Sequence, residues 1–207
     1  MHWSIGNVGS ISLSALLGLA VWALRTSTAD PVLAEGFRPI KEAEMPAGFP
    51  AYTPVGQIQV KQYPAYRKAT ASGAAEFWTL FSHIKQKHVT MTAPVEMDYG
   101  NFDSQNSKHR SMSFLYERPD QGSVGKHGSV EVIDVPAMKV VSIGCRGSQT
   151  SSAVAEAREK LLEFLANNKD GYTAAGPMRV MGYNSPFVPR DRNFFEVQIP
   201  VDTSKPD

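Results

Sequence analysis

The sequence has a single cysteine and almost equal numbers of basic and acidic residues. Each of these two features excludes a class of protein. Cys145 is alone among 207 residues, so the chain can form neither an intrachain disulfide nor a cluster of thiolate ligands around a metal. Its 21 basic and 20 acidic residues are mixed along the chain and leave a net charge of +1. We therefore expect no nucleic-acid partner, because such proteins carry a basic patch or stripe.

Sequence motifs of catalysis are missing as well. The chain contains no glycine-rich loop that would cradle phosphates and no pair of carboxylates at a motif spacing. The pairs Gly122-Ser123 and Gly147-Ser148 lack the second glycine of a nucleophile elbow. We therefore expect no enzyme of these classes.

The chain begins with an apolar segment. Residues 5–24 contain no charged side chain, and Arg25 follows them directly. We interpret residues 1–29 as a single membrane anchor or a secretory signal peptide, with a soluble or organelle-targeting leader as a third option. Residues 27–29 (Ser-Thr-Ala) suit signal cleavage, although no Lys or Arg precedes the apolar run. The folded part is thus expected to be membrane-anchored or exported, in a periplasmic or other extracytoplasmic space, with the membrane as a partner of this segment.

A proline-rich stretch separates this segment from the folded domain. Residues 30–54 show no sustained periodicity and are interpreted as a linker that lies against the domain. The linker contains Pro31, Pro39, Pro46, Pro50 and Pro54. The domain itself is predicted to cover residues 55–207.

Two similar units follow in this domain, each with the order strand, helix, strand, strand. The first comprises residues 55–68, 71–87, 89–99 and 111–117, and the second comprises residues 130–146, 152–167, 178–183 and 193–201. A duplicated unit of this kind predicts an α+β fold, in which two helices pack on a curled antiparallel sheet or distorted barrel. We expect a ligand groove at the seam between the two units.

The pattern inside the units supports these elements. In the first helix, Phe77, Leu80, Phe81 and Ile84 recur at the i, i+3, i+4, i+7 spacing of one helix face. In the following strand, Pro94 favours an edge strand or a bulge, because proline cannot donate to a ladder. The second helix is predicted to start at a cap formed by Ser151 or Ser152 and to end before Gly171.

Two motifs carry a family resemblance. Residues 89–95 (VTMTAPV), together with residues 182–186 (GYNSP) and 193–197 (NFFEV), resemble the signature of the SOUL heme-binding protein family over about residues 52–201. The resemblance implies the fold predicted above, which related effector-binding domains share. It also implies reversible, non-covalent binding of heme or another tetrapyrrole in an apolar groove, for carriage or buffering.

Candidate residues for such a ligand follow from its chemistry, because a porphyrin has apolar faces and anionic propionates. The positions that match the basic residues of heme-binding relatives are Ala74, Ser82 and Val188, so other cations would have to substitute for them. The apolar floor is assigned to Phe77, Phe81, Ile84, Met91 and Met97, for which core packing is the alternative, and the cations to Lys85, Arg190 and Arg192.

Three further side chains have open assignments. His83 and His88 are candidate iron ligands, but residues five apart on a helix point in different directions, and solvation at the helix end is the alternative. Glu196 shares a strand face with Phe194 and Gln198. It is either an exposed carboxylate or the centre of a site for a cationic or flat effector molecule, and a small hydrolase on the same scaffold is a further alternative.

Overall fold

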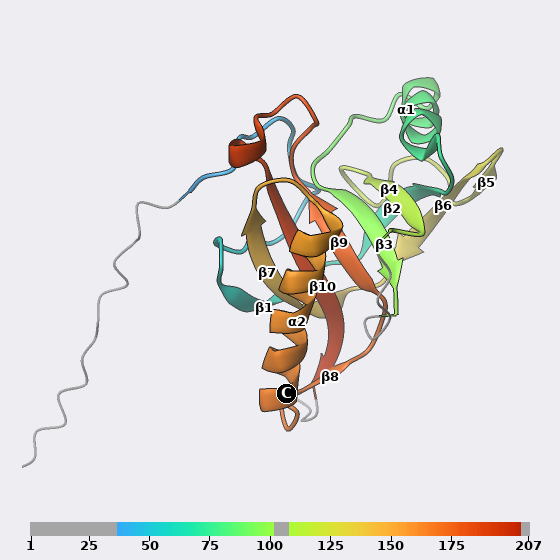
Figure 1. The fold of residues 1–207 in the computed structure, drawn as a ribbon. Helices are drawn as coiled ribbons and strands as arrows, with labels where there is room; N and C mark the ends of the chain where they lie inside the picture. The colour runs from blue at the N-terminus through green and yellow to red at the C-terminus, as the bar shows by residue number, and fades with distance from the viewer. Residues whose placement is uncertain (1–36, 102–107, 204–207) are drawn as a thin grey trace, which may run out of the picture. The chain divides into compact units, whose positions relative to one another are not determined.

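A ten-stranded antiparallel sheet and two α-helices form the part of the chain that the computed structural model describes, residues 37–101 and 108–203 (Figure 1). The sheet is not closed, because its strand order ends at β5 on one side and at β1 on the other. The predicted α+β class, with a curled open sheet and two helices, is confirmed. The anchor or signal predicted for residues 1–29 lies outside the described residues.

The elements have the following bounds. The first half contains β1 (Ile58–Tyr63), β2 (Tyr66–Ala71), α1 (Glu76–Gln86), β3 (Val95–Gly100) and β4 (Ser111–Leu115). The second half contains β5 (Gly125–His127), β6 (Val130–Val135), β7 (Met138–Arg146), α2 (Ser151–Asn167), β8 (Tyr172–Ala174), β9 (Met178–Gly182), the 3₁₀ helix η1 (Arg190–Arg192) and β10 (Phe194–Thr203). In the described ranges, neither α1 nor α2 combines the length and apolar character that a membrane span requires.

The strand order is symmetric about the pair β3 and β9. Without β5 and β8, it runs β1-β7-β10-β9-β3-β4-β2-β6. This order reads the same in reverse when β1 is exchanged with β6, β2 with β7, β3 with β9 and β4 with β10. The two halves therefore meet where β3 pairs with β9, from Val95 opposite Gly182 onward. A duplication of the sequence itself stays a prediction.

Several element boundaries differ from the prediction. The first predicted strand is two strands, because the chain turns at Pro64 between β1 and β2. The next strand begins at Val95, so Pro94 precedes the ladder and its missing N–H removes no ladder bond. The prediction of an edge strand is wrong, since β3 lies between β4 and β9. A register shift does occur in β3, but further along, between Asp98 and Gly100.

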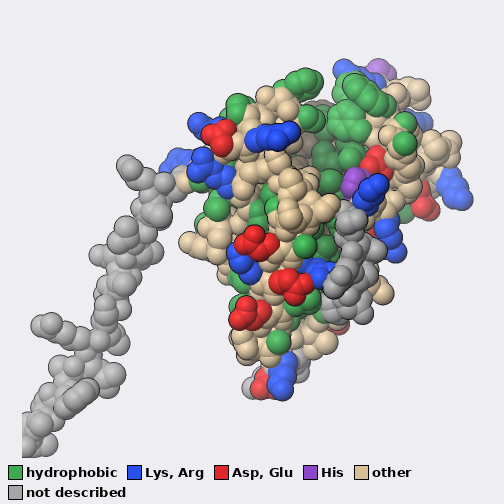
Figure 2. Space-filling model, in the orientation of Figure 1, with side chains coloured by type: hydrophobic (Ala, Val, Ile, Leu, Met, Phe, Trp, Pro, Cys, Tyr) green, Lys and Arg blue, Asp and Glu red, His purple; other side chains and the backbone are tan. Residues whose placement is uncertain are grey.

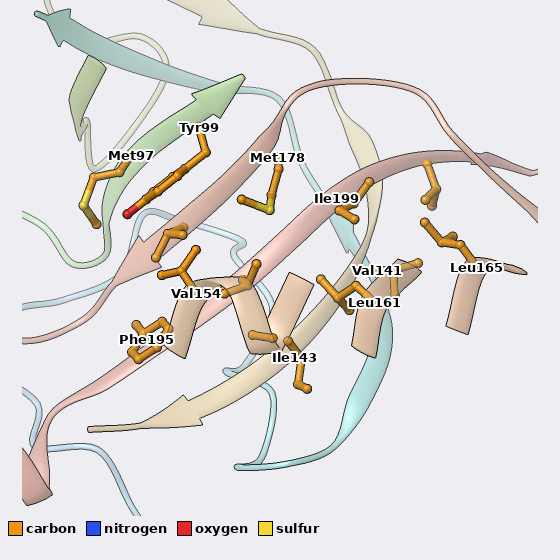
Figure 3. Packing of buried hydrophobic residues seen from close by; sticks show 14 residues of the cluster. Met97, Tyr99, Val141, Ile143, Val154, Leu161, Leu165, Met178, Phe195 and Ile199 are labelled. Atoms are coloured by element: carbon orange, nitrogen blue, oxygen red, sulfur yellow. The ribbon is translucent and has the colours of Figure 1, made fainter. Parts of the chain in front are cut away.

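The larger hydrophobic core lies between α2 and the sheet (Figure 3). Val154, Leu161 and Leu165 of α2 pack against Phe195 and Ile199 of β10. The helix begins where the Thr150 hydroxyl accepts a hydrogen bond from the Ala153 N–H at 3.2 Å. The predicted caps at Ser151 and Ser152 are therefore wrong by one or two residues, because Thr150 is the last residue with extended backbone.

A second, smaller core lies beneath α1. Leu80 and Ile84 are buried there against Phe114 and Val132 of the sheet. Phe81 and Met91 are only partly buried and lie at the border of this cluster. The first helix therefore uses one face for the core and leaves the rest of its surface open.

Residues 37–54 lie against the sheet on the face opposite the helices, and we call them the strap. Phe49 packs edge-on against Tyr63 and Tyr66, with ring centroids 4.9 and 5.2 Å apart. The Ala47 N–H donates to the Glu117 carbonyl at 2.8 Å. The strap thus has specific contacts with the sheet, as expected for a segment that packs on the domain.

Candidate functional site

Helix α1 exposes an aromatic surface. Phe77 and Trp78 are 36% and 66% exposed, and Phe81 is partly buried beside them. The rings of Phe77 and Phe81 are nearly parallel at 6.2 Å, and the Trp78 ring meets Phe81 edge-on at 6.1 Å. We call these three residues the α1 platform. Contiguous exposed apolar surface of this kind marks a place where a ligand or partner binds.

The platform borders a hollow in the molecular surface. Figure 2 shows hydrophobic side chains over α1 and on the facing loop between β9 and β10, with a depression between them. Phe187 of that loop is 94% exposed. Met91, in the loop from α1 to β3, is partly buried against the core beneath α1. Apolar side chains are therefore exposed on α1 and on the loop across the depression from it.

One predicted cation lies at the edge of this surface, and the other two lie on η1. The Lys85 ammonium lies 5.5 Å from the centre of the Phe81 ring, a distance at which the ring attracts it. Arg190 and Arg192 are exposed on η1, in the same loop as Phe187. The predicted cations are thus free to meet an anionic group of a ligand, and Lys85 adjoins the platform directly.

The two candidate histidines differ in their surroundings. His83 is 6% exposed, and its Nε2 lies 3.0 Å from the Tyr116 hydroxyl. Burial, together with the nearby His127 and Lys87, lowers the pKa of His83. His88 is exposed just beyond the helix, with a φ of 53°. The two side chains therefore do not converge, and no group of three or more metal-ligating side chains occurs in the described parts of the chain.

Glu196 lies on the other face of the sheet and is fully buried. Lys61 Nζ is 3.0 and 2.9 Å from its two carboxylate oxygens, and the Thr53 N–H of the strap also donates to it. Gln198 and Ser142 donate to Oε2 at 2.6 and 3.0 Å. Glu196 is thus neither an exposed carboxylate nor available to an external cation in this arrangement.

On the same face, buried polar side chains lie at the seam between the two halves. Glu96 of β3 and Arg179 of β9 are 3% and 5% exposed, and their side chains are joined through the Tyr66 hydroxyl. Phe49 of the strap covers Tyr66. Polar side chains and the strap therefore occupy much of the seam on this face, and in place of the predicted apolar groove a smaller pocket with a charged inner end remains beside Glu96 and Arg179.

Comparison with known proteins agrees with this architecture. A family model described as SOUL heme-binding protein matches residues 49–200. The chain belongs to the SOUL heme-binding protein family. The matched range includes the whole α1 platform and the β9–β10 loop of this SOUL protein, and the resemblance noted in the sequence is confirmed. A search of curated proteins finds no match.

Solved structures share the SOUL-type fold at low sequence identity. The crystal structure of the EcmrR C-terminal domain has 17% identity and a TM-score of 0.53, over 70% of this chain and 97% of that one. A structure described as a hydrolase from Listeria innocua has 12% identity and a TM-score of 0.52, over 73% of this chain and 94% of that one. At these identities the likeness shows the fold alone.

The structure brings together only part of the predicted SOUL ligand site. Phe77, Phe81, Lys85 and Met91 lie on or next to α1, whereas Glu196 lies across the sheet. Two predicted floor residues are buried in the cores, Ile84 at 3% and Met97 at 7% exposure.

Sequence reasoning missed Trp78 of the platform. Trp78 falls outside the i, i+3, i+4, i+7 stripe of α1. A large apolar residue on the polar side of an amphipathic helix was the signal available.

Proposed function

We propose that this SOUL-family protein binds heme or another tetrapyrrole reversibly and non-covalently on the α1 platform, for carriage or buffering and without catalysis. The observation that supports this proposal is the open aromatic surface of Phe77, Trp78 and Phe81 with the Lys85 ammonium beside it. A tetrapyrrole has the matching chemistry, because its faces are apolar and its propionates are anionic. The platform would hold the macrocycle, and Lys85 would attract a propionate.

The residues at α1 suit the apolar faces of the macrocycle better than they suit ligation of the iron. Burial of apolar surface contributes about 25 cal/mol per Å², so a ring that covers several aromatic side chains binds without a metal bond. His83 is hydrogen-bonded to Tyr116 in the core. Among the described residues, His88 is exposed beyond α1, whereas the imidazole of His109 is paired with Glu76 and that of His127 with the Ser123 carbonyl. Heme would bring its own iron chemistry, but affinity should depend chiefly on the platform. We therefore expect similar affinities for heme and for metal-free protoporphyrin.

A titration of the full chain tests the proposal. Hemin and metal-free protoporphyrin are titrated separately, and binding is followed by the Soret band. Trp78→Ala should weaken both by about tenfold, because one large aromatic contact of a binding surface is lost. Val60→Ala, at a 38% exposed apolar residue of β1, at the other end of the sheet from the strands beneath α1, is the control and should bind as the wild type does. Equal affinities of Trp78→Ala and the wild type would refute the platform as the site.

The alternative functions have less structural support. An effector site centred on Glu196 needs a free carboxylate, and Lys61 already neutralises this one. A hydrolase would need an accessible nucleophile or base, and Glu196 is fully buried. Membrane attachment or export through residues 1–29 remains a prediction, which fractionation of the full-length chain tests.

A further inference from the structure

We propose a second ligand site, on the sheet face opposite the helices, that binds a small molecule with one carboxylate and an apolar body. The site is a pocket of about 280 Å³ beside Glu96 and Arg179. Its inner end is polar and contains Tyr66, Lys68, Glu96 and Arg179, and its apolar walls include Pro136, Met138, Pro177 and Pro200. This proposal does not rest on tetrapyrrole binding at α1.

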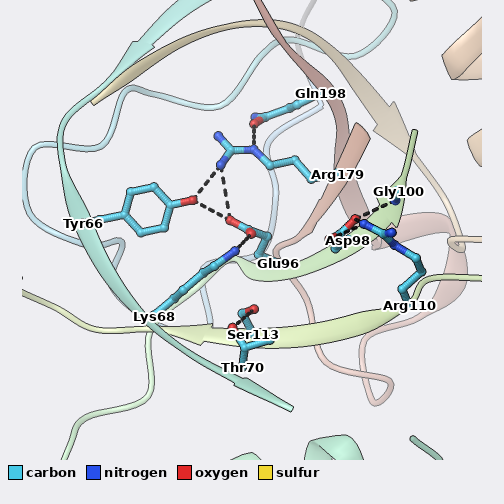
Figure 4. Close-up of polar contacts among 10 residues, drawn as sticks. All are labelled: Tyr66, Lys68, Thr70, Glu96, Asp98, Gly100, Arg110, Ser113, Arg179 and Gln198. Carbon is cyan, nitrogen blue, oxygen red and sulfur yellow. Dashed lines mark hydrogen bonds and ion pairs between the residues drawn. The ribbon is translucent and has the colours of Figure 1, made fainter. Parts of the chain in front are cut away.

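The inner end of the pocket has a net charge of +1, because it contains two cations, Lys68 and Arg179, and one carboxylate, Glu96. Lys68 Nζ donates to one oxygen of Glu96, and Arg179 Nη1 lies 3.3 Å from the other. Figure 4 shows these contacts around the single Glu96 carboxylate. Burial raises the pKa of Glu96, but the charges of Arg179 and Lys68 outweigh it and lower the pKa overall, so the carboxylate stays ionised. Two cations therefore share one anion.

The other carboxylates of the pocket do not supply the missing charge. Asp98 is bound through both oxygens by Arg110, at 3.2 and 3.1 Å. Asp134 is bound in the same way by Arg67, at 2.7 and 2.9 Å. Each of these aspartates is neutralised by an arginine that does not line the pocket. The excess charge at Lys68 and Arg179 is thus left for a ligand.

Arg179 also has unused hydrogen-bonding capacity. Its Nε donates to Gln198 at 3.0 Å and its Nη1 donates to Tyr66 at 2.7 Å. Its Nη2 is buried and has no hydrogen-bond partner among the described residues, and Figure 4 shows this nitrogen without a contact. A buried guanidinium nitrogen without an acceptor is costly, so an incoming acceptor near it would be stabilised. Lys68, with three N–H donors and a side chain 15% exposed, is the accessible contact for a carboxylate.

The chemical class of the ligand follows from the net positive charge at the inner end of the pocket and from the apolar residues that form its walls. A single excess positive charge matches a monocarboxylate, and it disfavours amines, which would add a third cation. Proline and methionine walls favour an apolar body, because such surfaces offer a ligand no hydrogen bonds. A cavity of about 280 Å³ is too small for a tetrapyrrole and large enough for a single aromatic or short aliphatic acid. The two proposed sites therefore take different ligands.

The site is separate from the α1 platform because side chains alternate along β3. Glu96 faces the pocket, whereas its neighbours Val95 and Met97 pack on the helix side. A ligand in the pocket can therefore be detected independently of one on α1.

Benzoate is the probe for this site, with neutral benzamide as its isostere. Benzoate should bind the full chain, and Lys68→Met should weaken it by about tenfold or more, since a charge-assisted hydrogen bond is lost. Lys126→Met removes the same charge from an exposed position on β5 and should leave benzoate binding unchanged. Benzamide bound as tightly as benzoate, or equal benzoate affinity in both variants, would overturn the proposal.

Methionine methyl NMR localises the probe without any substitution. With ¹³C-labelled methionine methyl groups, benzoate should shift the Met138 signal, because Met138 lines the pocket. The Met91 signal, beside α1, should not move. Metal-free protoporphyrin should give the reverse pattern if the platform proposal holds. Benzoate that leaves Met138 unshifted would refute the carboxylate site, whatever the result for protoporphyrin.

Discussion

Lys61 and Glu196 form a buried ion pair between residues 135 positions apart, with Lys61 Nζ at 3.0 and 2.9 Å from the two carboxylate oxygens. Their side chains are only 4% and 0% exposed. The pair joins β1 to β10 across β7, and the strap adds the Thr53 N–H. A carboxylate expected at a ligand site is therefore part of the interior that keeps this face of the sheet together.

Removing one partner of this pair should be costly. We expect Lys61→Met to destabilise the protein by about 3 to 5 kcal/mol, because Glu196 would be left as an unpaired buried charge. The double variant Lys61→Met/Glu196→Gln should recover part of this loss, since no charge remains unpaired. Urea unfolding followed by circular dichroism measures both. Lys160→Met, at an exposed pair with Glu156, is the control and should unfold like the wild type.

His83 should make stability fall at mildly acidic pH. Its pKa is lowered from the ordinary 6.5 by burial, by His127 and by Lys87, so the unfolded chain takes up the proton first. The folded state therefore loses stability as pH falls below 6.5, until His83 itself is protonated in the fold.

His83→Gln tests this dependence because it retains a hydrogen-bonding side chain next to Tyr116 and removes the titration. Urea midpoints at pH 7.5 and 5.5 should differ less in the variant than in the wild type. Equal pH dependence in both proteins would contradict the assignment.

The start of α2 provides a test of the Thr150 cap. Thr150→Ala should cost about 1 kcal/mol, because the Ala153 N–H would lose its acceptor. Thr150→Ser preserves the hydroxyl and should unfold close to the wild type. Thermal unfolding of both variants compares them directly, and an equal loss in the two would mean that the hydroxyl does not cap the helix.

The strap should contribute to the stability of the folded domain. Phe49→Ala removes a partly buried ring that contacts Tyr63 and Tyr66, and we expect a loss of about 2 to 3 kcal/mol. Lys41→Ala, whose side chain is 67% exposed, serves as the control in the same strap. Chemical unfolding gives the free energies. A Phe49→Ala protein as stable as the control would show that the strap is dispensable.

Lys85 should affect tetrapyrrole binding through charge. Lys85→Gln should weaken protoporphyrin binding a few-fold at low salt, because the propionates lose a nearby cation, and the difference should shrink in 1 M salt, where charges are screened beyond about 3 Å. Lys160→Gln, at an exposed lysine of α2, is the control. A Lys85 effect that is independent of salt would indicate that the side chain acts by packing on Phe81.

Much of the fold was accessible from local patterns. The apolar spacing of α2 identified the helix to within one residue, and the alternation in β10 correctly separated Phe195, Val197 and Ile199 from Phe194 and Glu196. Both patterns arise from the geometry of neighbouring residues, 3.6 per helical turn and two per strand repeat. The run at residues 89–95, together with residues 182–186 and 193–197, indicated the SOUL family, which the family model confirms.

The candidate sites depended on contacts between distant segments. No periodicity reports that Lys61 would reach Glu196, that the strap would cover the seam, or that Arg179 would keep a nitrogen without an acceptor. The exposure of Trp78 likewise depends on which face of α1 the sheet covers. Periodic burial is encoded within one element, so the sequence could reveal the elements and their buried faces. Charge pairing and surface exposure are set by the register of strands far apart in the chain, so only the packed structure decided which side chains remain available to a ligand.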